Sequence, residues 1–153
     1  MKAFIHLRSA RFPELPGEAG EMVNPGTVGK ALALHLQQRL QAMGRRAPFL
    51  CCEDWGWWVE LADAPFRFGV CIYSLPPEAE ADADADAATE GVGMAFCCTD
   101  GAVAERIWDW RRFRFIDTAP WAEALHGELL AILGDDPEVE LLGCGPSFPG
   151  TGA

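Results

Sequence analysis

The stretch CCEDWGWWVEL, residues 51–61, places two thiols and two carboxylates directly beside three tryptophans. These residue types could form a catalytic cluster, a metal site, or the edge of a core strand that carries a binding surface. A zinc site needs tetrahedral ligands, commonly supplied by C-x-x-C pairs. The vicinal pairs Cys51-Cys52 and Cys97-Cys98 lack this spacing, and neighbouring residues of a strand point to opposite faces. Each pair alone is therefore not expected to hold an ion, although two adjacent strands could offer one thiol each.

Catalysis needs a nucleophile or an acid–base group with a partner. Of the three histidines, His35 and His126 fall on predicted helices, where a solvated or capping role is typical. A Cys51–His6 or Glu53–His6 pair stays open if the strands that carry these residues adjoin, and no nucleophile-elbow motif occurs. We therefore expect a protein without enzymatic activity and without a cofactor. The alternative is a small cytoplasmic enzyme or a metal-binding protein that uses the cysteine-bearing sheet.

Two motifs resemble ligand-binding loops but fail at defining positions. NPGTVGKA, residues 24–31, has Asn24 where a phosphate-binding loop needs its first glycine and Ala31 where it needs Ser or Thr. DADAD, residues 82–86, has the acid spacing of a calcium loop, but Ala87 stands at the obligatory glycine position. The first motif predicts the start of a helix, and the second predicts a solvated loop.

The chain of 153 residues has a formal net charge of −11. Six acids within residues 78–90 supply −6 of this charge, and the other 17 acids against 12 bases supply −5. Such a chain repels phosphate, which argues against direct nucleic-acid binding and suits a basic protein partner. The sequence has no secretory h-region and no run of about 18 apolar residues. We expect a cytoplasmic protein that does not bind membranes and keeps its six cysteines reduced.

Hydrophobic periodicity predicts a single domain over residues 1–153. Alternation predicts strands over 1–7, 56–62, 66–75, 92–98 and 137–142, and helical spacing predicts helices over 25–43, 102–110 and 118–134, with a strand or extended segment over 111–117. Asn24 is the expected N-cap of the first helix and Thr118 that of the last. The result is an α+β fold, with a single mainly antiparallel sheet of about four to six strands and two main helices packed against it. We also expect a flexible acidic loop over about 78–91 and a mobile tail over about 143–153.

Alternation places Trp55 and Trp57 on the core face of their strand. Trp58 and Glu60 point to the opposite face, which otherwise carries small residues such as Gly69 that allow close approach of a helix or another protein. A large aromatic side chain beside acids is typical of an interface hot spot. The candidate partner-binding residues are Glu53, Asp54, Trp58, Glu60, Glu78, Glu80, Asp82, Asp84 and Asp86.

Four stretches, NPGTVGKALALHLQQRL, EDWGWWVEL, FRFGVCIY and FRFID, together resemble small bacterial immunity proteins of polymorphic toxin systems, and in particular immunity protein family 52. The resemblance covers about residues 1–142. It implies a tryptophan-containing α+β protein that is encoded beside a toxin of restriction-endonuclease type and protects the producing cell by binding that toxin. It implies no catalytic residues. The expected partner is a cognate toxin, a basic nuclease domain occluded by this chain; a homodimer is also compatible with the sequence.

Overall fold

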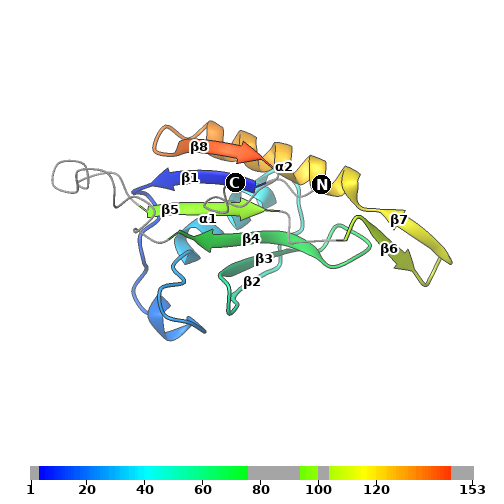
Figure 1. Ribbon diagram of the computed structural model, residues 1–153, viewed down its shortest axis with the longest axis horizontal. Coiled ribbons are helices and arrows are strands. Elements are labelled where there is room, and N and C mark those ends of the chain that lie inside the picture. Colours follow the sequence, from blue (N-terminus) through cyan, green and yellow to red (C-terminus); the bar gives the residue numbers. More distant parts are fainter. Residues whose placement is uncertain (1–3, 76–93, 100–103, 146–153) are drawn as a thin grey trace, which may run out of the picture.

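The computed structural model describes residues 4–75, 94–99 and 104–145, and its main element is a six-stranded antiparallel sheet in the order β2-β3-β4-β5-β1-β8 (Figure 1). The strands of this sheet are β1 (Phe4–Ser9), β2 (Phe49–Cys52), β3 (Trp57–Leu61), β4 (Phe68–Ser74), β5 (Met94–Thr99) and β8 (Glu140–Gly145). The other described elements are the helices α1 (Lys30–Ala42) and α2 (Ala119–Gly134), the 3-10 turn η1 (Glu18–Gly20), and a separate hairpin of β6 (Arg106–Asp109) and β7 (Arg114–Asp117). The predicted α+β class is confirmed.

Both helices pack against the same face of the sheet (Figure 1). Alternate residues of the central strands, such as Val59, Val70 and Phe96, are completely buried on that face. Leu36 of α1 and Leu129 of α2 meet them in one core cluster. Because a strand repeats every two residues and a helix about every 3.6, both patterns present one apolar face to the same layer. The opposite face of the sheet is free of helices within the described residues.

Helix α1 begins at Lys30, five residues later than predicted, and Asn24 is not its N-cap. The buried carboxylate of Glu18, in η1, accepts the backbone N–H groups of Gly29 and Lys30 at 2.9 Å each. Asn24 instead donates to a backbone carbonyl just before β3 at 2.6 Å. Unpaired N–H groups and the helix dipole both favour a negative charge at this end of a helix. A carboxylate from a distant position in the sequence therefore replaces the expected local cap.

Strand β2 was not among the predicted strands, and the turn that joins it to β3 changes the position of Trp55. The Glu53 N–H donates to the Gly56 carbonyl at 2.7 Å, which closes a turn before Trp57. This turn interrupts the strict alternation, so Trp55 does not join Trp57 on the core face. Its ring instead packs against Tyr73, with 5.2 Å between the ring centroids, on the face opposite the helices. The predicted core position of Trp55 is wrong.

The predicted short helix over 102–110 is also wrong, because β6 occupies residues 106–109. Ile107 lies opposite Ile116 across the hairpin, and Trp108 lies opposite Phe115. These cross-strand pairs stabilise the extended form, whereas a helix of about two turns is marginal without partners. In Figure 1 the hairpin projects from one end of the main sheet.

Strand β8 forms an edge of the sheet beside β1 and runs to Gly145, beyond the predicted end at residue 142. Residues 143–145 therefore belong to the sheet and not to a tail. The rest of the predicted tail and the acidic segment 78–91 lie outside the described residues. Neither helix in the described ranges has both the length and the apolar character that a membrane crossing needs.

Candidate functional site

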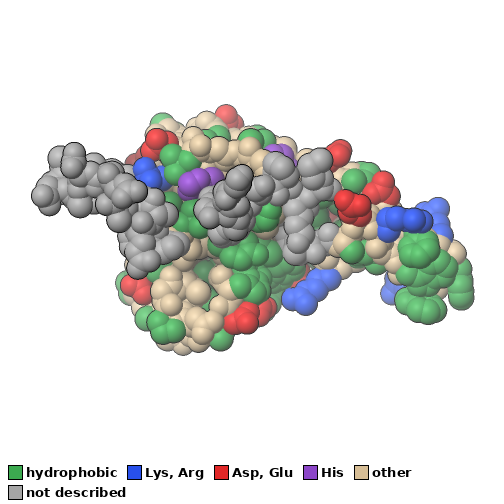
Figure 2. Space-filling view, in the orientation of Figure 1, with side chains coloured by type: hydrophobic (Ala, Val, Ile, Leu, Met, Phe, Trp, Pro, Cys, Tyr) green, Lys and Arg blue, Asp and Glu red, His purple; other side chains and the backbone are tan. Residues whose placement is uncertain are grey.

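The hairpin β6–β7 carries the largest group of exposed aromatic rings in the described part of the chain. Trp110 is 76% exposed, Phe113 75% and Phe115 54%. The ring of Trp108 contacts all three edge-on, at centroid distances of 6.0, 6.5 and 5.0 Å. Figure 2 shows the projecting end of the molecule as a hydrophobic patch next to basic side chains. We call these four residues the aromatic cluster; exposed apolar groups of this kind mark interaction sites.

Two features of the hairpin are costly for the free protein. Phe113 adopts a positive φ of 49°. This left-handed conformation costs a residue other than glycine about 1–2 kcal/mol. The indole N–H of Trp108 is buried and finds no hydrogen-bond acceptor among the described residues; a buried N–H group that stays unpaired costs about 1–3 kcal/mol. Asp109 fixes the turn by accepting the Arg111 N–H at 2.9 Å. The hairpin therefore displays its rings at some expense to folding.

The hairpin is basic within an acidic chain. Residues 106–117 contain four arginines and two aspartates, a net charge of +2. The guanidinium of Arg106 lies 4.5 Å from the centroid of the Phe115 ring, and Arg112 is 3.8 Å from the carboxylate of Asp109. Arg111 and Arg114 are exposed without such contacts in the described region. Aromatic rings and arginine are the side chains most enriched in interface hot spots.

A cavity of about 830 Å³ opens at the base of the hairpin, over the face of the sheet that the helices leave uncovered. Its walls come from the β2–β3 turn, β3, the β3–β4 loop, β4, the segment before β6 and β6 itself: Glu53, Trp55, Trp58, Pro65, Phe66, Arg67, Cys71, Tyr73, Ala104 and Ile107. The guanidinium of Arg67 lies 5.2 Å from the centroid of the Trp58 ring. The volume is within the range of about 300–1,000 Å³ that is typical of ligand sites. We call this site the aromatic cavity.

The structure brings together some of the residues predicted for partner binding and separates others. Glu53 and Trp58 both line the aromatic cavity, and Trp58 is buried there instead of lying open on the surface. Asp54 is exposed in the adjoining turn, and Glu60 lies half-buried on β3 opposite Gly69. Glu78, Glu80, Asp82, Asp84 and Asp86 lie outside the described residues.

The aromatic cluster was missing from the predicted site. The signal in the sequence is the pair Trp108 and Trp110 around Asp109, followed by arginines that alternate with Phe113 and Phe115. The predicted helix and following strand would place these four rings on two separate elements. The hairpin of the structure brings all four together.

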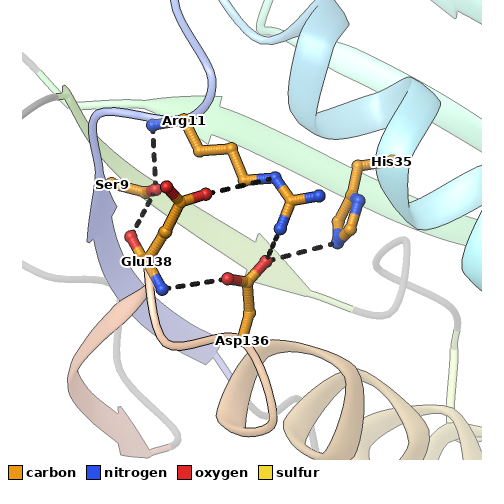
Figure 3. Close-up of polar contacts among 5 residues, drawn as sticks. All are labelled: Ser9, Arg11, His35, Asp136 and Glu138. Carbon is orange, nitrogen blue, oxygen red and sulfur yellow. Dashed lines mark hydrogen bonds and ion pairs between the residues drawn. The ribbon is translucent and has the colours of Figure 1, made fainter.

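A second polar cluster joins the end of β1, helix α1 and the turn between α2 and β8 (Figure 3). Arg11 is bonded to Asp136, and His35 Nε2 lies 3.9 Å from the same carboxylate. Ser9 donates its hydroxyl to the Glu138 carbonyl at 2.7 Å. Because the serine proton points to a backbone carbonyl and not to the histidine, this is not the arrangement of a nucleophile and its base. Burial and the nearby Arg11 lower the pKa of His35, so the cluster is a structural junction with a neutral imidazole.

The histidine pairs that the sequence left open do not form. His6 lies on β1 and Cys51 on β2, and three strands separate them in the sheet. At about 4.8 Å per strand step the separation is roughly 19 Å, too far for proton transfer from either Cys51 or Glu53.

The buried cysteines are poorly suited to chemistry. Cys97 and Cys98 are completely buried and point to opposite faces of β5. Burial raises the pKa of the Cys97 thiol to about 12 and also raises that of Cys98, so both stay protonated. No group of three or more His, Cys, Asp or Glu side chains is placed to hold a metal ion within the described ranges.

Comparison with family models, with curated proteins and with solved structures finds no match. The site is therefore interpreted from its own geometry.

Proposed function

We propose that the protein is a binding protein that neutralises a cognate toxin, a nuclease domain, by occluding it with the aromatic hairpin. The observation that carries this proposal is the exposed aromatic cluster on β6–β7. The resemblance of the sequence to bacterial immunity proteins supports the same function. The hairpin takes the central role, and Glu53 and Trp58 contribute from the adjoining cavity.

The cluster supplies enough apolar surface to anchor a complex. A tryptophan side chain can bury up to about 250 Å², so the exposed part of Trp110 is roughly 190 Å². Phe113 is exposed to a similar fraction. Burial of a few such rings in a pocket typically supplies most of the binding energy of an interface, while the surrounding contacts exclude water.

The charges of this protein are complementary to two parts of a nuclease, its metal site and its substrate channel. A metal-dependent nuclease site holds its ions with carboxylates, which the arginines of the hairpin would pair with. The substrate channel around such a site is basic, because it must attract phosphate. The acidic remainder of the chain, from which the sequence-derived candidates come, would face that channel.

Co-purification tests the proposal. The tagged chain is expressed with the product of the gene beside its own and captured in moderate salt, and the nuclease activity of the captured protein is then titrated with the free chain. We expect a stoichiometric complex and complete loss of DNA cleavage at one equivalent. A captured protein that retains full activity at saturation would overturn the neutralising function.

Aromatic rings beside arginines also stack on the bases of single-stranded nucleic acid, so a fluorescent oligonucleotide is the second arm of the test. The net charge of −11 disfavours that partner. Binding of the oligonucleotide at micromolar concentration, with no toxin captured, would replace the proposal by a nucleic-acid function.

A further inference from the structure

The aromatic cavity contains a carboxylate that forms no ion pair with any of the residues that the structure describes. Glu53 is half-buried in the cavity wall, and within the described residues its carboxylate has one polar contact, the Cys51 thiol at 3.5 Å. Burial and the adjacent Glu53 raise the pKa of that thiol, which keeps it neutral. A partly desolvated charge without a counter-charge is unfavourable, and a cation entering the cavity would relieve it.

The walls around Glu53 are suited to a cation. The rings of Trp55 and Tyr73 pack against each other at 5.2 Å, and Trp58 contributes a third ring. Faces of such rings attract ammonium and guanidinium groups, and most strongly in a desolvated site. The protein already makes one such contact, since the Arg67 guanidinium lies over the Trp58 ring. Arg67 lines the same cavity but forms no ion pair or hydrogen bond with Glu53 within the described residues, so the Glu53 carboxylate remains available to a second cation.

We infer that the aromatic cavity is the receptor for an arginine or lysine side chain of the bound toxin. This inference rests on the proposed function and adds the chemistry of one contact to it. Ala104, just before β6, and Ile107 of β6 line the cavity, so a partner held by the hairpin reaches the cavity directly. A basic nuclease presents many such side chains, and a buried guanidinium between a carboxylate and aromatic rings is an arrangement that gives specificity as well as affinity.

A titration with a small probe tests the receptor without the toxin. The side-chain indole N–H signals of the ¹⁵N-labelled protein are followed by NMR as N-acetylarginine methylamide is added, with the signals of Trp55 and Trp58 assigned from single Trp→Phe variants. We expect saturable shifts of these two signals in the millimolar range. N-acetylcitrulline methylamide, which has the same shape without the charge, should bind with less than a fifth of the affinity of N-acetylarginine methylamide.

Matched variants separate the charge from the fold. Glu53→Gln should weaken arginine binding at least fivefold, while Glu140→Gln, an exposed carboxylate on β8 at the other edge of the sheet, should leave it unchanged; both variants should keep the dispersed spectrum of a folded protein. Equal shifts with citrulline, binding that survives Glu53→Gln, or preferential binding of propionate through Arg67 would each overturn the inference. None of these results depends on capture of the toxin, so the proposed function would stand or fall separately.

Discussion

Removal of the buried Glu18 carboxylate should destabilise the protein strongly. Its Oε1 accepts the N–H groups of Gly29 and Lys30 at 2.9 Å, and its Oε2 accepts the Leu15 N–H at 2.7 Å. The side chain is completely buried, so water cannot replace these bonds. A hydrogen bond to a charged group contributes about 1.5–3 kcal/mol, and a buried donor left without an acceptor costs a similar amount.

The variants Glu18→Gln and Glu18→Ala should lower the free energy of unfolding by different amounts. Glu18→Gln keeps one oxygen for the helix donors but turns its amide N–H₂ group toward the Leu15 N–H, and we expect a loss of about 2–3 kcal/mol in the free energy of unfolding. Glu18→Ala leaves three donors unpaired and opens a small void, for an expected loss of about 4–5 kcal/mol. Glu21→Gln is the control, because the Glu21 carboxylate pairs with Lys30 at the surface and should contribute little.

Urea denaturation followed by far-UV circular dichroism measures these differences through the midpoint at constant m-value. The reasoning predicts the order of stability wild type, Glu21→Gln, Glu18→Gln, Glu18→Ala. If Glu18→Gln matched the wild type within about 0.5 kcal/mol, the carboxylate would not be the cap of α1, and this part of the fold would need another explanation.

Two further predictions concern the sheet and the polar junction. Gly69→Ala should cost about 2–3 kcal/mol in a denaturant titration, because a Cβ would lie 2.3 Å from the Val59 carbonyl oxygen and 2.8 Å from the Trp58 ring; an unchanged midpoint would contradict this packing. The protein should lose stability as the pH falls below about 6.5, because burial and Arg11 lower the folded pKa of His35, so the unfolded chain takes up that proton first. Thermal melts between about pH 5 and 8 should therefore show a shallower loss for His35→Gln than for the wild type, and equal slopes would rule this linkage out.

The sequence predicts the elements that repeat regularly. Strict alternation is enough to predict β3 and β4, and apolar spacing with a terminal glycine is enough to predict α2. Their registers follow from the same pattern, because one face of each strand must meet the helices. The α+β class can therefore be predicted from the sequence, whereas β2 and β6 could not.

Elements whose conformation depends on residues far away in the sequence could not be predicted. Trp108 and Ile107 fit a helix or a strand locally, and only pairing with β7 decides between them. The start of α1 is fixed by Glu18, a residue 12 positions before Lys30 whose role no local cap pattern reveals. Trp55 lies within the turn that the Glu53–Gly56 hydrogen bond closes, and this turn places its ring on the face opposite the helices.

The candidate site was predictable only in part for the same reason. Glu53 and Trp58 were predicted from their composition, and the structure places both at the aromatic cavity. The cavity also needs Tyr73 from β4 and Ile107 from β6, which are brought there by strand pairing and by the position of the hairpin. Single-sequence patterns carry no such long-range information, so the aromatic cluster was divided between two predicted elements.

The affinity of the captured toxin for a hairpin variant tests the central claim most directly. Trp110→Ala combined with Phe113→Ala removes two rings that are about three-quarters exposed, together with their edge-on contacts to Trp108, so the fold should lose only about 1–3 kcal/mol of stability. Phe49→Ala is the matched control, because Phe49 is 50% exposed on β2, away from the hairpin. If the hairpin is the anchor, isothermal titration calorimetry should show at least a thirtyfold weaker complex for the double variant and an unchanged one for the control. Full affinity of the folded double variant would contradict the account.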